Sequence, residues 1–309
     1  MSALDSTRHA RAWGYSLVFA SSLALMSGAA AQESYKTPEE AASAFAAAVK
    51  AGPKGLLKVL GSAGEDIVDS GDDVADKEAR DKFTSAYEAK HSVKVDGKKA
   101  SLIIGADDFP FPIPLLQTKT GWEFDTNEGR QEILFRRIGR NELDTIQTCL
   151  AYVDAQDEYS DTDHGDGVGV YAQRIVSSPG KKDGLYWPSD KNDSPLGPIA
   201  AEASSEGYKV GGEPQPYHGY YFRILTEQGP NAPGGTLHYI VKGKMIGGFA
   251  LVAYPADYGN SGVMTFIVNH AGTVYQKDLG EDTDVIAKRM TAFDPDETWK
   301  KVDTSEASK

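Results

Sequence analysis

The stretch DYGNSGVMTFIVNHAGTVYQKDLG, residues 257–280, has the pattern of two short β-strands joined by a turn. Asn269 and Gly272 are the first and fourth residues of its Asn-His-Ala-Gly turn, which suits a type I turn, so a hairpin is expected. The stretch also contains GNSG, residues 259–262, the tetrapeptide seen around the nucleophile of many serine proteases. No histidine of the chain lies in a motif typical of a catalytic base. We therefore interpret the glycines as a tight connection between strands and Ser261 as a turn residue.

The rest of the second half predicts one long helix and two more strands. Runs with strand character at residues 220–226 and 249–254 are bounded by Gly, Pro, Asn or Asp. Apolar residues at helical spacing over residues 131–159 predict the helix, whose regular part is expected to start near Asn141 because Gly139 interrupts the pattern. We expect this helix to pack against a four-stranded antiparallel sheet.

The first half predicts helices followed by a small antiparallel sheet, so the whole chain is expected to be α+β. Thr37 is expected to cap the first helix, and two more helices are expected over residues 54–60 and 76–90. Asp96-Gly97 between two short β-rich runs predicts a hairpin. In its order of elements this half resembles nuclear-transport-factor-like or cystatin-like folds, which implies helices packed on a curved sheet.

The segment FPFPIPL, residues 109–115, alternates apolar residues with three prolines. Prolines have no N–H, and alternate amides of an extended chain point to the same side, so an edge strand tolerates this pattern. The same alternation predicts that Phe109, Phe111 and Ile113 share one face, either in the core or lining a pocket. A polyproline-type segment is the alternative interpretation.

The N-terminus has the three-part plan of a secretory signal peptide. Arg8 and Arg11 precede an apolar run over residues 13–26, and small residues follow it, so cleavage is expected before Gln32. The product is expected to be periplasmic or secreted. No second apolar run is long enough for a membrane helix, so no membrane span is expected in the mature chain.

Charge and cysteine content exclude several classes of function. The chain has 32 basic and 45 acidic residues and a formal net charge of −13, and such a surface repels nucleic acid. The single cysteine, Cys149, has no partner for an internal disulfide and is expected to be a buried, inert thiol. No phosphate-binding loop, dinucleotide fingerprint or transition-metal pattern is found. No cofactor is therefore expected, apart from the calcium hypothesis given below.

The length of the chain predicts two domains. The expected divisions are a signal peptide at 1–31, an N-terminal α+β domain at 32–130, a C-terminal α+β domain at 131–300 and a disordered tail at 301–309.

Three motifs carry a resemblance to a known type of domain. They are GYYFRI at residues 219–224, ALVAYPADYGNSGVMTF at 250–266 and VNHAGTVYQKDLG at 268–280. Together with the long helix they resemble the globular heads of type IV pilins and type II secretion pseudopilins. This resemblance implies one helix on a four-stranded antiparallel sheet. No prepilin cleavage site and no apolar helix leads into residue 141, so assembly into a pilus is not implied.

A second resemblance covers the whole mature chain. FPFPIPL, YVDAQDEY, DGLYWP and YPADYGNSGVMTFIVN are similar to motifs of an uncharacterised family of exported bacterial proteins, the domain of unknown function numbered twenty-nine fifty. This resemblance implies a periplasmic location and no particular activity.

An acidic loop, DTDHGDG at residues 161–167, is a candidate calcium site. Asp161, Asp163 and Asp166 alternate with other residues around glycines, and carboxylate oxygens are the ligands that calcium prefers. The twelfth position from Asp161, where an EF-hand loop has an acidic residue, is Ala172. A solvated acidic loop is the alternative.

Aromatic residues among glycines and prolines form the candidate binding site. The candidates are Tyr186, Trp187, Tyr217 and Tyr221, which are expected to form a platform for a glycan or an extended peptide. Ordinary packing of these side chains is the alternative.

The sequence favours a non-enzymatic binding or cell-envelope assembly protein, because no complete catalytic set is present. Its expected partner is an unknown envelope protein or a glycan. The alternative is an envelope hydrolase that uses Ser261 or the paired carboxylates Glu123 and Asp125, which lie two apart on a predicted strand and so share a face.

Overall fold

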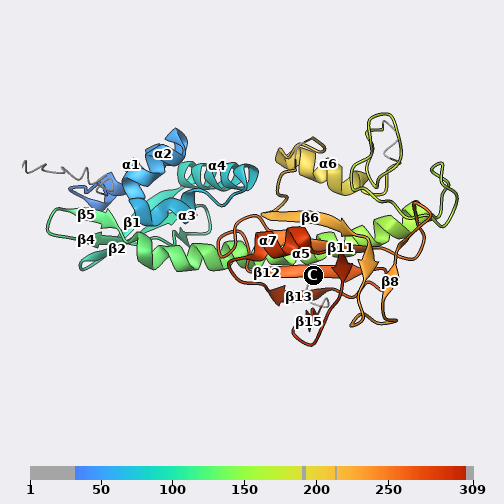
Figure 1. The fold of residues 1–309 in the computed structure, drawn as a ribbon. Coiled ribbons are helices and arrows are strands. Elements are labelled where there is room, and N and C mark those ends of the chain that lie inside the picture. The colour runs from blue at the N-terminus through green and yellow to red at the C-terminus, as the bar shows by residue number, and fades with distance from the viewer. Residues whose placement is uncertain (1–31, 190–192, 213, 304–309) are drawn as a thin grey trace, which may run out of the picture.

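The computed structural model describes residues 32–189, 193–212 and 214–303. The expected signal peptide lies outside the described residues. The chain is an α+β protein, as predicted. It forms two lobes joined by one long helix, α5 (Thr126–Ser160), which runs through both of them (Figure 1). Within the described part of the chain, no helix has the length and apolar character needed to cross a membrane.

The first lobe consists of helices packed on an antiparallel sheet. Its helices are α1 (Pro38–Ala51), α2 (Pro53–Leu60), the 3-10 turn η1 (Ser62–Gly64), α3 (Glu65–Val68) and α4 (Asp73–Ala89). Its strands are β1 (His91–Asp96), β2 (Lys99–Ile104), β3 (Phe109–Pro110), β4 (Leu115–Gln117) and β5 (Trp122–Phe124). The strand order is β1-β2-β4-β5. The short β3 also pairs with β2, on the same edge as β4 but at the other end of the strand.

Local signals explain why these elements form where they do. Thr37 caps α1, since its hydroxyl accepts a hydrogen bond from the Glu40 amide at 3.1 Å. The predicted hairpin is confirmed, but its turn lies one residue later than expected: Asp96 pairs with Lys99, so Gly97 and Lys98 form the turn. The core of the lobe forms around the ring of Phe45, which lies 4.9–5.1 Å from the rings of three other phenylalanines. These are Phe83, Phe111 and Phe124.

The proline-rich segment forms much less strand than the sequence predicts. Only Phe109–Pro110 pairs with β2 as a strand, and after the Phe111 amide donates to the Leu102 carbonyl at 2.7 Å the chain leaves the ladder until β4. The prediction of one shared face is wrong at Phe109, which is 43% exposed, whereas Ile113 is fully buried. The physical reason is that prolines donate no ladder hydrogen bonds, so the segment bends and the alternation of faces is lost.

The second lobe is built on a five-stranded antiparallel sheet with strand order β15-β13-β12-β11-β6. These strands are β6 (Tyr220–Leu225), β11 (Ala250–Pro255), β12 (Met264–Asn269), β13 (Tyr275–Asp278) and β15 (Lys300–Lys301). The smaller elements are α6 (Gly197–Glu206), β7 (Glu227–Gln228), β8 (Leu237–His238), β9 (Ile240–Val241), β10 (Lys244–Met245), α7 (Thr283–Arg289) and β14 (Ala292–Phe293).

The four strands that the sequence predicts correspond to β6, β11, β12 and β13. The predicted turn closes the β12–β13 hairpin, since the Gly272 amide donates to the Asn269 carbonyl at 2.8 Å. The expected count of four strands is wrong because β15 pairs with β13 as a fifth. Lys301, expected to begin a disordered tail, lies in this strand, and residues 304–309 are outside the described range.

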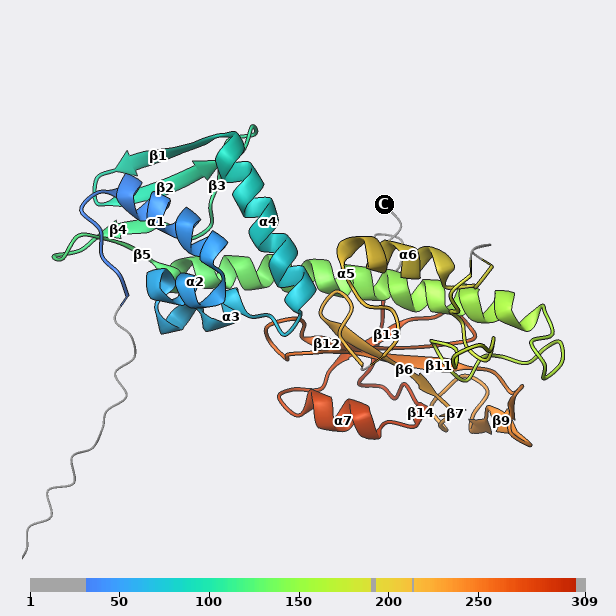
Figure 2. The same ribbon diagram turned by 90° about the horizontal axis from the view of Figure 1, so that it is seen from above.

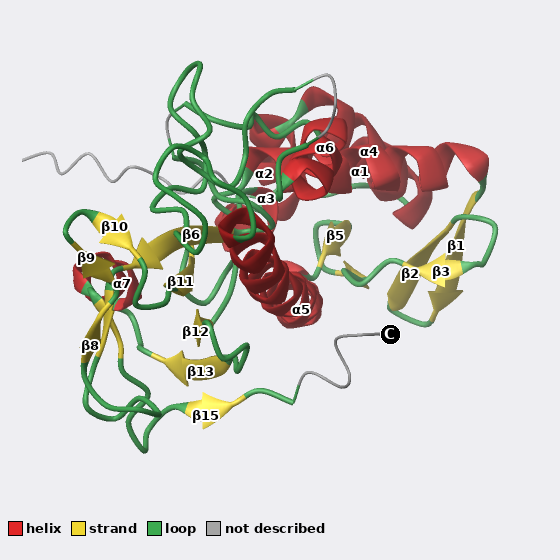
Figure 3. Cartoon of the chain, turned by 90° about the vertical axis from the view of Figure 1, so that its right-hand side faces the viewer, coloured by secondary structure: helices red, strands yellow, loops and turns green. Residues whose placement is uncertain are grey.

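Helix α5 packs along β12 and β11, while α7 lies on the opposite side of the sheet (Figures 2 and 3). The expected start of the regular helix near Asn141 is wrong, since α5 begins at Thr126 and continues past Gly139. Gly139 is exposed, and a Cβ added there would meet no atom within 4 Å apart from its own helix backbone, so the glycine weakens helix propensity without leaving a packing defect. The helix passes through the expected boundary at residues 130 and 131 and belongs to both lobes.

A network of buried polar groups holds the two lobes together beside α5. Arg137 of α5 donates to the backbone carbonyls of Asp66 and Ile67 at 2.6 and 2.8 Å and also to the side-chain oxygen of Asn260. The amide of Asn260 donates in turn to the Asp69 carbonyl at 2.8 Å. We call these contacts, together with those of Asp72, the junction.

Asp72 completes the junction because one carboxylate serves both lobes. Its Oδ1 caps α4 by accepting from the amides of Val74 and Ala75 at 3.2 and 3.1 Å. Its Oδ2 accepts from the Tyr208 hydroxyl and the Gly219 amide of the second lobe, each at 2.9 Å. Asp72, the residue just before α4, therefore helps to fix the position of the lobes.

Candidate functional site

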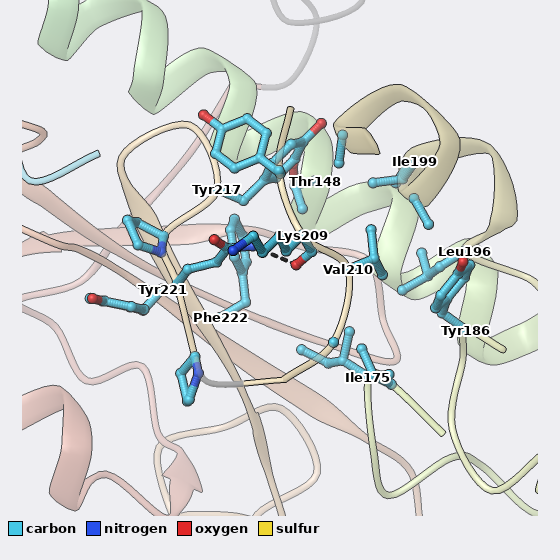
Figure 4. Close-up of a pocket in the computed structure, with 18 of the residues that line it drawn as sticks. Thr148, Ile175, Tyr186, Leu196, Ile199, Lys209, Val210, Tyr217, Tyr221 and Phe222 are labelled. Carbon is cyan, nitrogen blue, oxygen red and sulfur yellow. Dashed lines mark hydrogen bonds between the residues drawn. The ribbon is translucent and has the colours of Figure 1, made fainter. Parts of the chain in front are cut away.

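The second lobe contains a cavity of about 370 Å³ between α5, α6, β6 and two loops (Figure 4). We call it the aromatic cavity. Thr148 and Tyr152 line it from α5, and Tyr221 and Phe222 line it from β6. The remaining walls come from α6, from the loop around Ile175 and Tyr186, and from the loop that joins α6 to β6.

Helix α6 leaves space for the cavity because two of its three lining side chains are small. Pro198 occupies the first turn, where its missing N–H costs nothing, and Gly207 ends the helix with a φ of +106°. The buried residues Ala200 and Ala203 lie on the cavity side. A larger side chain at either position would fill part of the volume.

The wall is apolar and aromatic, with few polar groups. Among the described residues that line it, Lys209 is the only one with a charged side chain, and no carboxylate or imidazole contributes. Burial is the main cause that raises the pKa of Tyr208 and of Tyr217 far above the ordinary phenol value. Both hydroxyls are therefore neutral hydrogen-bonding groups at any physiological pH. Such a cavity suits an uncharged, largely apolar ligand.

Three of the four predicted binding residues line this cavity, namely Tyr186, Tyr217 and Tyr221. Tyr186 is held in the wall by two backbone hydrogen bonds. Its amide donates to the Ile175 carbonyl at 2.9 Å, and its carbonyl accepts from the Ser177 amide at 2.8 Å. The ring of Tyr217 packs edge-on against Tyr208 with centroids 5.1 Å apart. Their shared role in binding stays a prediction.

Trp187, the fourth predicted residue, does not line the cavity. It is 5% exposed, its Nε1 donates to Asp193 at 3.1 Å, and the Lys182 ammonium lies 4.7 Å from its ring centroid. Neighbouring residues of an extended segment point to opposite sides, so Tyr186 and Trp187 face different surroundings.

His218 lies behind the cavity wall and connects three elements. Its ring stacks on Tyr217 with centroids 4.1 Å apart, its Nε2 is 2.9 Å from Glu206 of α6, and its Nδ1 is 3.3 Å from Asp144 of α5. Burial disfavours the charged ring, but the two carboxylates outweigh burial and raise the pKa of His218 to about 9. The imidazolium is therefore present at neutral pH and holds the wall to both helices.

The GNSG tetrapeptide forms a turn. The Ser261 side chain is fully buried, and its hydroxyl accepts from the Asp257 amide at 2.9 Å and donates to the Asp257 carbonyl at 3.1 Å. Gly259 has a φ of +79°, which a glycine adopts without strain. Among the described residues no imidazole is bonded to this hydroxyl, so the geometry of a serine nucleophile and its base is not assembled here.

The paired carboxylates also have structural partners. Asp125 caps α5, since its Oδ1 accepts from the Glu128 amide at 3.1 Å. Glu123 accepts from the hydroxyls of Thr118 and Thr120 at 3.2 and 2.8 Å. Both side chains therefore stabilise the turn and the helix start around β5.

The structure does not bring the three candidate calcium ligands together. Asp163 accepts from the amides of Gly165 and Gly167 at 2.7 and 2.8 Å, and Asp166 lies 3.8 Å from the Lys244 ammonium. Asp161 follows the end of α5 as its C-cap. No group of three or more His, Cys, Asp or Glu side chains within the described ranges could hold a metal ion. Calcium binding stays an untested hypothesis.

Sequence reasoning missed most of the cavity wall and the whole junction. Ile175, Leu196 and Ile199 are isolated apolar residues in irregular segments or a short helix, so no periodic pattern marks them. The available signal was the run of glycines and prolines between Val210 and Tyr217, which indicates a loop folded back on the wall.

One comparison with known proteins gave a match. The family model described as "Protein of unknown function (DUF2950)" matches residues 32–302. No curated protein matches the chain, and no solved structure does. The resemblances to nuclear-transport-factor-like, cystatin-like and pilin-head folds therefore stay predictions.

Proposed function

The chain belongs to the DUF2950 family of proteins of unknown function, as its motifs predict, and from this premise we propose that it is an exported, non-enzymatic binding protein. Its ligand enters the aromatic cavity. The periplasmic location rests on the signal-peptide plan of residues 1–31.

The observation that carries the proposal is the wall of the aromatic cavity. A volume of about 370 Å³ is within the usual range for ligand pockets, and its surface combines aliphatic side chains with tyrosines. Tyrosine rings give large contact areas with little loss of side-chain entropy, and their hydroxyls orient a ligand.

The chemistry of the wall favours an apolar side chain of an envelope peptide over a sugar. Sugars present many hydroxyls, and the described part of the wall, which has no carboxylate, leaves most of them without partners. Ile175, Leu196 and Ile199 instead provide contacts that an aliphatic or aromatic side chain fills. We therefore propose an extended segment of an envelope protein as the partner.

Titration with N-phenyl-1-naphthylamine, a neutral apolar fluorophore, tests this proposal. We expect its fluorescence to rise on binding, and Phe222→Ala to weaken binding by about tenfold because an aromatic contact in the wall is lost. The matched control is Tyr258→Ala, at a residue outside the cavity whose hydroxyl bonds Asp278 at 2.9 Å. Unchanged binding in a folded Phe222→Ala protein, or equal loss in both variants, contradicts the proposal.

The non-enzymatic part has its own test. Treatment with a fluorophosphonate probe is expected to leave Ser261 unlabelled, because both hydrogen bonds of its hydroxyl go to the backbone of Asp257. Labelling at Ser261 would favour the rival function, an envelope hydrolase.

A further inference from the structure

A second cavity, of about 240 Å³, lies in the first lobe between α1, α2, α4 and α5. Its interior is apolar and is lined by Phe45, Val49, Leu56, Leu60, Phe83 and Phe111. These belong to the core of the lobe, so the cavity extends from the surface into the core.

The mouth of this cavity carries a concentration of positive charge. Arg80 reaches it from α4, while Arg137 and Arg140 reach it from α5, three residues apart and thus on one face of the helix. Asp76 is the single carboxyl in the lining. The lining therefore has three guanidiniums and one carboxyl, so this site is locally positive although the whole chain has a net charge of −13. We call the site the arginine cavity.

Two of the charged groups are already engaged by the protein. Arg137 makes its hydrogen bonds within the junction, and Asp76 accepts from the Ser70 amide at 2.9 Å. Burial is the main cause that lowers the pKa of Arg137, while the charge of Asp76 opposes this shift and the charge of Arg140 adds to it. Asp76 therefore partly balances Arg137, and Arg140 is a further positive charge beside them.

Arg80 and Arg140 are available for a ligand. Neither side chain has an ion pair or hydrogen bond to any of the described residues, whereas Arg136 on the same helix pairs with Glu132 at 2.7 Å. Arg140 is exposed and Arg80 is half-buried, whereas Phe45 and Leu60 are buried, so the two guanidiniums lie nearer the surface than the apolar end of the cavity.

We propose that the arginine cavity binds an amphipathic anion, a single alkyl chain ending in a carboxylate. The chain fills the space among Phe45, Phe83 and Leu60, where its burial is favourable. The carboxylate lies at the mouth between Arg80 and Arg140, since the planar guanidinium binds carboxylate oxygens in a bidentate manner. This site is separate from the aromatic cavity and takes a charged ligand rather than a neutral one.

Calorimetric titration of the whole chain with decanoate, decanol and acetate separates the contribution of the ligand's carboxylate from that of its alkyl chain. We expect decanoate to bind, decanol to bind about tenfold more weakly, and acetate not to bind, because both the charge and the apolar chain are needed. Equal affinity for decanol and decanoate would overturn the role of the arginines, and no binding of decanoate would overturn the site.

Variants locate the binding in this cavity. The double variant Arg80→Gln with Arg140→Gln is expected to weaken decanoate by about tenfold or more and to leave decanol unchanged. Arg136→Gln, the matched control on α5, is expected to change neither. Phe222→Ala, in the wall of the aromatic cavity, is a second control that leaves decanoate binding intact. Loss of decanoate binding in Phe222→Ala with none in the double variant would place the ligand in the aromatic cavity and contradict the proposal.

Discussion

Helix α5 lines both cavities, but the side chains in the two walls differ in charge. Thr148 and Tyr152 of α5 line the aromatic cavity, and Arg137 and Arg140 of the same helix line the arginine cavity two to four turns earlier. The aromatic cavity offers neutral phenols and a single charged side chain, the exposed Lys209, among its described residues, whereas the arginine cavity offers three guanidiniums around a phenylalanine-lined interior. Apolar volume alone therefore does not define the ligand, because the groups at the mouth decide which charge is accepted.

The junction between the cavities differs from both of them. It is made of backbone carbonyls, Asn260, Arg137 and Asp72 rather than of apolar side chains. Polar groups of this kind require defined geometry, and an unpaired member is costly when buried. The junction therefore fixes how the lobes are arranged, and the cavities supply space for ligands.

The largest expected effect comes from breaking the junction with Arg137→Met. This change leaves the carbonyls of Asp66 and Ile67 and the side chain of Asn260 without their donor. We expect the free energy of unfolding, measured with urea, to fall by about 2–4 kcal/mol. The two lobes are expected to unfold in separate transitions, because α5 alone would then join them.

Arg136→Met is the matched control for this experiment. Its guanidinium pairs with Glu132 four residues away on an exposed helix face, and such pairs contribute little. We expect a change of about 0.5 kcal/mol or less. A similar loss in both variants would show that α5 itself, and not the junction, holds the lobes in place.

The comparison of the lobes also shows what the sequence could predict. The cap at Thr37, the hairpin at Asp96-Gly97 and the turn at Asn269 were predictable because each signal lies within a few residues of the chain. The family was predictable from its motifs for the same reason.

The cavities and the junction were not predictable because their residues come together only in three dimensions. Arg137 and Asn260 are 123 positions apart, and Asp72 and Gly219 are 147 apart. The start of α5 was misplaced because Gly139 has low helix propensity, while packing against both lobes keeps the helix continuous. Tertiary contacts decided the result at these positions.

A smaller effect is expected from deprotonating His218 beside the aromatic cavity. The folded pKa of about 9 lies above the ordinary value of 6.5, so the ion pairs with Asp144 and Glu206 contribute fully below pH 6.5. Their contribution is lost as the pH rises through about 9. We expect the thermal midpoint of the wild-type chain to fall over this range by a few degrees more than that of His218→Gln. Parallel pH profiles for the two proteins would contradict the assignment.

The smallest effect is expected from Ser261→Ala, which tests whether the GNSG stretch is a turn. The hydroxyl makes two hydrogen bonds to the backbone of Asp257, whose carbonyl also accepts from the amides of Asn260 and Ser261, so the loss falls mainly on the Asp257 amide. We expect the free energy of unfolding to fall by about 1 kcal/mol. Ser62→Ala, at an exposed residue, serves as the control and is expected to change the free energy of unfolding by less than about 0.5 kcal/mol.

Binding of N-phenyl-1-naphthylamine and of decanoate by Ser261→Ala is expected to stay as in the wild type, because Ser261 lines neither cavity. If the variant keeps its stability but loses a binding or hydrolytic activity of the chain, Ser261 acts on a ligand and the turn interpretation is wrong.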